Sequence, residues 1–132
     1  MNKRVLLVDD DEEDCYIFTQ VLQQVDKELE IICVTSGAAL LDLLKIKEPP
    51  DYIFLDLNMP GMHGLECLRY ITHKSALRKT PVIVYSTSSN PRHIKEAFDE
   101  GAANYIVKSP SITILKQQFK EIFDANTPLQ RS

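Results

Sequence analysis

Five short apolar runs alternate along the chain with longer segments in which apolar residues recur at helical spacing. Within each run the apolar residues are continuous, as expected for strands that are buried on both faces of a sheet. The runs lie at residues 5–8, 31–34, 52–55, 82–85 and 105–107. Strict strand–helix alternation predicts an α/β fold with a mainly parallel, helix-covered sheet. Five units are too few for a β/α barrel, so a doubly wound open sheet with five helices is expected.

Residues at the segment boundaries support this division of the chain. Ser36 stands where a helix N-cap is expected, and Pro49-Pro50 would stop the helix that follows it. Pro91 suits the first turn of the fourth helix, and Gly101 suits the position just after that helix ends. The fifth helix is expected to end near Phe123.

Length, charge and cysteine content exclude several classes of protein. A chain of 132 residues is one ordinary domain, and its net charge of −4 argues against binding nucleic acid through a basic surface. Cys15, Cys33 and Cys67 form no CxxC pair, so they indicate neither a disulfide framework nor a zinc site and suit a reducing cytoplasm. Cys33, in the second strand, is expected in the core. No apolar run approaches the ~20 residues that span a membrane, and the apolar run before Asp9 is too short for a signal peptide.

Charged and hydroxyl residues gather where four of the predicted strands end. They are Asp9-Asp10-Asp11 after the first strand, Asp56 and Asn58 after the third, Ser86-Thr87 after the fourth, and Lys108 after the fifth. Because all strands of a parallel sheet point the same way, these residues converge on the edge where such folds bind their ligands.

This combination of residue types predicts a particular chemistry. Crowded carboxylates repel one another and need a cation, and hard oxygen ligands suit Mg²⁺, which often accompanies phosphate. A lysine and a hydroxyl supply hydrogen-bond donors for phosphate oxygens. The set therefore indicates phosphoryl transfer in which a carboxylate accepts the group.

Each feature also has a purely structural interpretation when it is taken alone. The acidic triplet could be a helix N-cap with its first turn, and Asp56 could be an Asx-turn residue. Tyr105 could fill the core, and the histidines at 63, 73 and 93 show no metal-ligand spacing. Their joint occurrence at four separate strand ends favours a functional site.

Four segments resemble the receiver domain of two-component response regulators. They are VLLVDD at 5–10, FLDLNMPGMHG at 54–64, VYS at 84–86 and GAANYIVK at 101–108, of which the second is highly specific. The resemblance covers about residues 3–123, so a single receiver domain over 1–132 is expected, with 124–132 as a C-terminal tail. It implies a flavodoxin-like α/β fold whose five-stranded parallel sheet has the order 2-1-3-4-5.

The resemblance also implies roles for individual residues. Asp56 would be the phosphorylated aspartate, and Lys108 would pair with it or with its phosphoryl oxygens. The implied Mg²⁺ ligands are Asp10 directly, Asp9 mainly through a bound water, Asp56, and the backbone carbonyl of Asn58.

Three further positions would form a conformational switch. Ser86 would hydrogen-bond the phosphoryl group, and Tyr105 would be the aromatic residue that rotates in response. Thr87 fills a place where the family often has a smaller residue, which would narrow access to the phosphoryl group. The chain also departs from the family pattern at Ser109, where proline is usual, and a cis peptide before Ser109 would cost about 3 kcal/mol.

The function implied is that of a phospho-accepting response regulator in a two-component phosphorelay. It would take a phosphoryl group from a sensor histidine kinase or a phosphotransfer protein and would signal in trans to a downstream target protein. It would not be an enzyme, although it would assist its own phosphorylation and dephosphorylation. The expected output surface combines the fourth helix, the fifth strand and the fifth helix, and a homodimer through it is left open. No direct contact with nucleic acid or a membrane is expected.

Other functions fit the sequence less well. A dehalogenase-type phosphatase needs a second aspartate two residues after the acceptor, where this chain has Asn58. An FMN-binding flavodoxin would place a phosphate beside the acidic triplet, and a dinucleotide fold needs a GxGxxG motif that does not follow the first strand. The remaining alternative is a protein-interaction module with the receiver fold whose output does not depend on phosphorylation.

Overall fold

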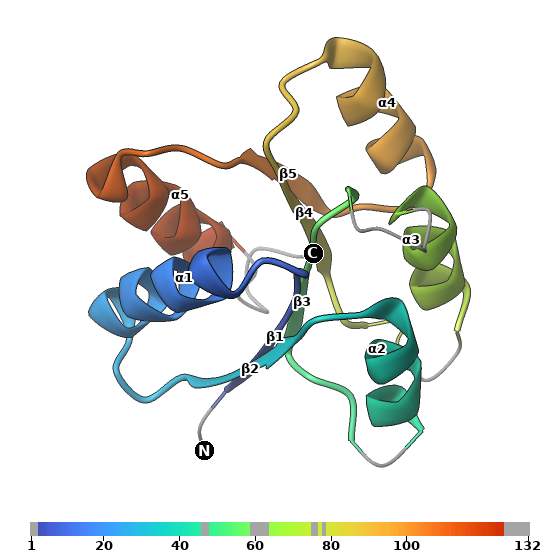
Figure 1. The fold of residues 1–132 in the computed structure, drawn as a ribbon, viewed down its shortest axis with the longest axis horizontal. Helices are drawn as coiled ribbons and strands as arrows, with labels where there is room; N and C mark the ends of the chain where they lie inside the picture. The colour runs from blue at the N-terminus through green and yellow to red at the C-terminus, as the bar shows by residue number, and fades with distance from the viewer. Residues whose placement is uncertain (1–2, 46–47, 59–63, 75–76, 78, 126–132) are drawn as a thin grey trace.

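A computed structural model describes residues 3–45, 48–58, 64–74, 77 and 79–125 of the chain. Its centre is a five-stranded parallel sheet in the order β2-β1-β3-β4-β5, which confirms the predicted fold (Figure 1). The strands are β1 (Arg4–Val8), β2 (Glu30–Val34), β3 (Tyr52–Leu55), β4 (Val82–Ser86) and β5 (Asn104–Val107).

Helices cover both faces of this sheet. They are α1 (Glu12–Val25), α2 (Gly37–Leu44), α3 (Gly64–His73), α4 (Pro91–Asp99) and α5 (Ile112–Ala125). Helices α1 and α5 lie on one face, and α2, α3 and α4 lie on the other (Figure 1). Strands and helices therefore alternate strictly along the chain, as the sequence predicts and as a doubly wound fold requires.

The continuous apolar runs of the strands follow from burial on both faces. In β1, Val5 and Leu7 pack in the cluster beneath α1 and α5, whereas Leu6 and Val8 pack in the cluster beneath α2, α3 and α4. All four side chains are at most 1% exposed. Strand β2 lies at the edge of the sheet, and its Cys33 is exposed, so the expectation that this cysteine lies in the core is wrong.

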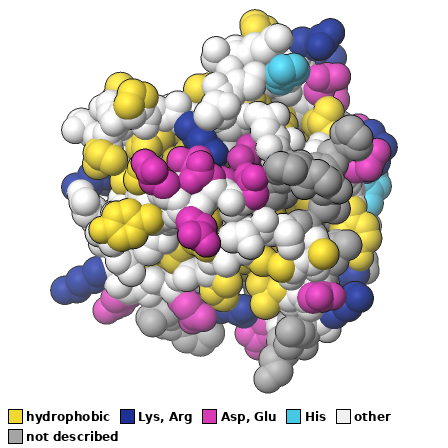
Figure 2. All heavy atoms as spheres, viewed as in Figure 1, with side chains coloured by type: hydrophobic (Ala, Val, Ile, Leu, Met, Phe, Trp, Pro, Cys, Tyr) yellow, Lys and Arg dark blue, Asp and Glu magenta, His cyan; other side chains and the backbone are white. Residues whose placement is uncertain are grey.

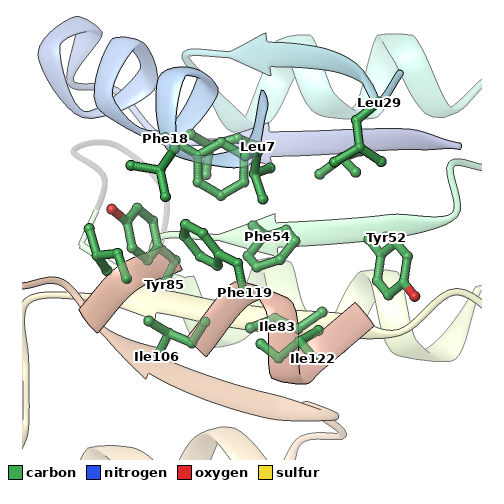
Figure 3. Packing of buried hydrophobic residues seen from close by; sticks show 14 of the residues in the cluster. Leu7, Phe18, Leu29, Tyr52, Phe54, Ile83, Tyr85, Ile106, Phe119 and Ile122 are labelled. Atoms are coloured by element: carbon green, nitrogen blue, oxygen red, sulfur yellow. The ribbon is translucent and has the colours of Figure 1, made fainter. Parts of the chain in front are cut away.

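Four aromatic rings form the centre of the cluster beneath α1 and α5 (Figure 3). Phe18 contacts Phe54 and Phe119 edge-to-face, with centroid separations of 5.0 and 5.3 Å. Tyr85 completes the group at 5.6 Å from Phe18 and 5.9 Å from Phe119. Such tilted arrangements of buried rings contribute beyond their buried area, and here they support the ends of β3 and β4.

The predicted boundary residues act as expected where the structure describes them. The Ser36 hydroxyl caps α2 by accepting the Ala39 N–H at 3.1 Å, and Pro91 begins α4. Gly101 follows α4 with a φ of 105°, a left-handed conformation that favours glycine. Helix α2 ends at Leu44, ahead of the two prolines, and α5 continues to Ala125, two residues past the predicted end.

Three further expectations concern the remaining segments. Residues 59–63 of the segment FLDLNMPGMHG lie outside the described residues, as does most of the expected tail at 124–132. Every described peptide bond is trans, including the bond that joins Lys108 to Ser109. Among the described helices, none combines the length and the apolar character that crossing a membrane requires.

Candidate functional site

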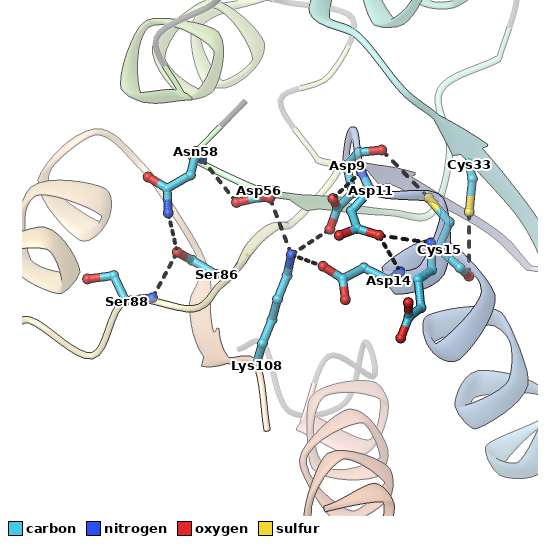
Figure 4. A network of polar contacts seen from close by, with 11 residues as sticks. Asp9, Asp11, Asp14, Cys15, Cys33, Asp56, Asn58, Ser86, Ser88 and Lys108 are labelled. Atoms are coloured by element: carbon cyan, nitrogen blue, oxygen red, sulfur yellow. Dashed lines mark hydrogen bonds and ion pairs between the residues drawn. The ribbon is translucent and has the colours of Figure 1, made fainter. Parts of the chain in front are cut away.

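The register of the sheet brings the predicted site residues together at the carboxyl ends of the strands. Val8 pairs with Leu55, so Asp9 and Asp56 follow side by side, and the Asp56 N–H donates to the Val8 carbonyl at 2.9 Å. Ser86 pairs with Val107, so Lys108 follows next to it. Figure 4 shows the Lys108 side chain directed toward Asp9 and Asp56, with the Ser86 hydroxyl turned toward Asn58, and Figure 2 shows acidic side chains gathered around a basic one on this face.

Three carboxylates form a potential cation site at this edge. Oxygen atoms of Asp9, Asp10 and Asp56 all lie within 4.8 Å of one another. Asp9 is fully buried and Asp56 is 6% exposed, whereas Asp10 faces solvent. Burial raises the pKa of Asp9, and hydrogen bonds from Lys108 and the Asp11 N–H oppose that rise.

The acidic triplet divides into two roles. Asp9 and Asp10 belong to the carboxylate cluster, whereas Asp11 is the N-cap of α1 and accepts the N–H groups of Glu13 and Asp14 at 2.9 and 3.2 Å. The Asp9 side chain also accepts the Asp11 N–H at 3.0 Å, which fixes the carboxylate at the start of the helix. Asp11 therefore has the structural role of a helix cap, whereas Asp9 and Asp10 remain the residues of the triplet that are available to a cation.

Lys108 is the cation of the site and contacts three carboxylates. Its Nζ lies 2.7 Å from Asp9, 2.8 Å from Asp14 and 3.3 Å from Asp56. The same atom lies 5.2 Å from the centre of the Tyr85 ring, within cation–π range. Burial alone would lower the pKa of Lys108, but the hydrogen bonds to Asp14 and Asp9 outweigh it, and the pKa lies above its usual range.

Ser86 connects the acceptor segment with the loop that follows β4. Its side chain is buried, and its Oγ accepts the Asn58 side-chain amide at 3.3 Å and the Ser88 N–H at 3.2 Å. The Tyr105 hydroxyl donates to the Ser88 carbonyl at 2.8 Å. Thr87 is exposed between these residues. A pocket of about 220 Å³ opens beside Asn58, Ser86 and Tyr105, and it is also lined by Leu65, His93 and Glu96.

The Asp56 carboxylate is also oriented by a backbone N–H group close to it in the sequence. One of its carboxylate oxygens accepts the Asn58 N–H at 3.0 Å, which is the geometry of an Asx-turn, and the other faces Lys108. The local turn therefore orients the carboxylate without removing it from the cluster.

The residues present fit a divalent cation of the Mg²⁺ type. All the clustered side-chain ligands are hard oxygen donors, and Mg²⁺ is commonly bound through one or two carboxylates together with waters. Lys108 supplies a single positive charge against the negative charges of Asp9, Asp10 and Asp56. The imbalance favours a bound cation.

Comparison with known protein families decides the identity of the fold. The model of the response regulator receiver domain family matches residues 5–120. The chain belongs to this family. Receiver domains are modules of two-component signalling, and interaction with histidine kinases or phosphotransfer proteins is a property of the family.

Relatives of this receiver domain occur in proteins of different length. It is 33% identical over 104 residues to the two-component response regulator ORR11 of Oryza sativa subsp. indica, with 79% of this chain and 69% of that protein covered. It is 41% identical over 108 residues to a protein-glutamate methylesterase of Koribacter versatilis, with 80% of this chain and 28% of that protein covered. It is 33% identical over 114 residues to a probable cyclic di-GMP phosphodiesterase of Vibrio cholerae, with 86% and 25% covered. The chain therefore spans only about a quarter of the last two proteins.

Solved structures agree over nearly the whole chain. The phosphorylated cyanobacterial phytochrome response regulator RcpA has a TM-score of 0.84 and 30% identity, with 95% of this chain and 94% of that chain covered. The Mn²⁺-bound form of the response regulator Rcp1 has a TM-score of 0.79 and 28% identity, with 94% and 93% covered. The response regulator RPA3017 of R. palustris red-light signalling has a TM-score of 0.85 and 26% identity, with 98% and 96% covered.

The sequence prediction of this receiver site missed one residue. Asp14 lies in the first turn of α1, and its carboxylate contacts Lys108 from a position 94 residues away in the sequence. A first-turn acid is common without any function, so the sequence offers only a weak signal for it. The two described histidines lie outside the carboxylate cluster, since His73 contacts the Arg69 carbonyl and His93 contacts the Ser88 hydroxyl.

Proposed function

We propose that this receiver domain accepts a phosphoryl group on Asp56 in a Mg²⁺-dependent transfer from a sensor histidine kinase or a phosphotransfer protein. The observation that carries the proposal is the environment of the Asp56 carboxylate. It lies at the end of a central strand, is nearly buried, is oriented by the Asn58 N–H, and faces Lys108 beside Asp9 and Asp10. These are the parts that a phosphoryl-accepting carboxylate requires.

The chemistry is a single displacement at phosphorus. An Asp56 oxygen attacks the phosphorus atom of a phosphohistidine, a new P–O bond forms, and the P–N bond breaks with its electron pair returning to the imidazole nitrogen. A Lys108 N–H donates to a phosphoryl oxygen and stabilises the charge there. Bound by Asp9, Asp10, Asp56 and the Asn58 carbonyl, Mg²⁺ would neutralise the negative charge that otherwise repels the phosphoryl group.

The protein is not an enzyme in this proposal, because the group stays on its own side chain until water removes it. The site assists both its own phosphorylation and its own dephosphorylation. We further place the protein in the cytoplasm, because a reducing compartment preserves its three free cysteines.

We also propose that Ser86, Thr87 and Tyr105 transmit the phosphorylated state. Ser86 would leave its contacts with the Asn58 amide and the Ser88 N–H and would donate to a phosphoryl oxygen instead. The loop after β4, with Thr87 at its start, would follow, and the Tyr105 hydroxyl would lose its acceptor on Ser88. Tyr105 could then turn into the adjacent pocket.

The output surface that we propose is the face formed by α4, β5 and α5, because Tyr105 lies on β5 and the switching loop leads into α4. A downstream target protein, or a second copy of the chain, would bind there in trans. Lys95→Glu on α4 should change that association and leave the phosphorylation of Asp56 intact. Sedimentation and pull-down experiments with and without a phosphodonor measure this, and identical association in every case would place the output elsewhere.

Intact-mass measurement after incubation with acetyl phosphate and Mg²⁺ tests the central proposal. The wild type should gain one phosphoryl group, Asp56→Asn should gain none, and chelation of Mg²⁺ should abolish the gain. Asp124→Asn, which changes an exposed aspartate at the end of α5, serves as the matched control and should behave as wild type. Absence of any gain in the wild type would favour the phosphorylation-independent interaction module.

A further inference from the structure

Lys108 distributes its hydrogen bonds among three carboxylates instead of directing them all to Asp56. The two shorter contacts, of 2.7 and 2.8 Å, are made with Asp9 and Asp14, and the contact with Asp56 is 3.3 Å. An ammonium group has three N–H donors, so these three partners use its full capacity. A phosphoryl oxygen on Asp56 can therefore receive a hydrogen bond from Lys108 only if one of these contacts is given up.

Of the two carboxylates that make the shorter contacts, Asp14 is the one that Lys108 can release more easily. Asp9 is fully buried, so without Lys108 it would depend on another cation, whereas the Asp14 side chain is 30% exposed and can be hydrated by water. Asp14 also lies outside the cluster of Asp9, Asp10 and Asp56 that would hold Mg²⁺. Its negative charge is favoured at the N-terminus of α1 whether or not Lys108 is present.

We propose that Asp14 is a positioning residue that holds the Lys108 ammonium group away from the phosphoryl position in the resting protein. The inference rests on the proposed phosphorylation of Asp56. It adds that the Asp14 carboxylate competes with the phosphoryl group for Lys108. The short contact of Lys108 with Asp14 competes with the phosphoryl group for the position of the ammonium group, which lies farther from Asp56 than from Asp14. Asp14 therefore lowers the affinity of the site for a phosphoryl group and limits how far the domain is activated at a given supply of phosphodonor.

The competition predicts the effect of neutralising Asp14. In Asp14→Asn, Lys108 loses a charged partner and is more available to a ligand on Asp56. The affinity for beryllofluoride, which mimics a phosphoryl group on a carboxylate, should rise about twofold to fivefold, the range of a partly exposed ion pair. Asp14→Glu preserves the charge and should remain close to the wild type.

Two readouts test this inference. The first is ¹⁹F NMR of bound beryllofluoride, titrated in the presence of Mg²⁺. The second is the side-chain ¹⁵N signal of Lys108 in protein without Mg²⁺ or beryllofluoride, which reports the contact with Asp14 directly. Glu13→Gln is the matched control, since it removes an exposed charge from the same helical turn. Thermal unfolding establishes that each variant is folded.

The proposal is supported if Asp14→Asn shifts the Lys108 signal and raises the affinity more than Glu13→Gln does. It is overturned if the Lys108 signal is unchanged, or if the affinity of Asp14→Asn equals or falls below that of the control. A wild type that binds no beryllofluoride and takes up no phosphoryl group would overturn the proposed function itself. In that case the Lys108 signal would still show whether Asp14 holds the ammonium group.

Discussion

Asp10 should destabilise the metal-free protein and stabilise it when Mg²⁺ is present. Its carboxylate lies within 4.8 Å of those of Asp9 and Asp56, and Lys108 contacts the other two carboxylates. At 4.8 Å in a medium as polar as water, two unit charges repel each other by about 0.9 kcal/mol. Two such repulsions, offset in part by the positive charge of Lys108 beside Asp9 and Asp56, leave a net penalty of about 1 kcal/mol.

Asp10→Asn should therefore stabilise the metal-free protein by about 1 kcal/mol. For a chain of 132 residues, the entropy of unfolding makes this a rise of about 4 °C in Tm. Mg²⁺ at ten times its Kd should stabilise the wild type by about 1.4 kcal/mol, or about 5 °C, because only the folded protein binds it. The variant should lose most of this gain, because it lacks a charged ligand.

Thermal unfolding followed by circular dichroism, with and without MgCl₂, measures both effects in one experiment. Glu12→Gln removes a charge from the exposed first residue of α1, outside the cluster, and should keep the full response to Mg²⁺. If Asp10→Asn lowered the Tm of the metal-free protein, the argument from repulsion would be wrong. If it kept the wild-type gain with Mg²⁺, Asp10 would not be a ligand.

Three further predictions concern packing and cysteine chemistry. Gly64→Ala should lower the free energy of unfolding by about 2 kcal/mol or more in chemical denaturation, because its Cβ would lie 2.3 Å from the Leu57 Cα. Iodoacetamide should label the exposed Cys33 rapidly and Cys67 only on unfolding, as peptide mass mapping would show, because burial raises the Cys67 pKa to about 11. The same shift should lower the free energy of unfolding by about 2–3 kcal/mol in total between pH 9 and 11. The reason is that the Cys67 thiol ionises at a lower pH in the unfolded chain than in the folded protein. Denaturation of Cys67→Ala across that range should show a smaller fall.

The fold could be predicted because its signals are local. Each strand is a continuous apolar run, and residues such as Ser36 and Gly101 mark helix boundaries by their own backbone chemistry. The adjacency of Asp9 and Asp56 could also be predicted, since both directly follow strands that point the same way. These inferences need only the direction of the strands and no side-chain geometry.

The contact between Lys108 and Asp14 could not be predicted in the same way. This contact depends on how closely the first turn of α1 approaches the end of β5, and that distance is set by packing throughout the sheet. The exposure of Cys33 was mispredicted for a similar reason, because a local run of apolar residues does not show that its strand lies at an edge. The division of the acidic triplet between the helix cap at Asp11 and the carboxylate cluster of Asp9 and Asp10 likewise follows from where α1 begins.

Chemical localisation of the phosphoryl group tests the central claim most directly. Borohydride reduces an aspartyl phosphate to homoserine, whereas a free carboxylate does not react. After incubation with acetyl phosphate and Mg²⁺, reduction and peptide sequencing by mass spectrometry should place homoserine at position 56 and at no other aspartate. Homoserine at position 9, 10 or 14 in place of 56, or no homoserine at all, would contradict the assignment of Asp56 as the phosphoryl acceptor.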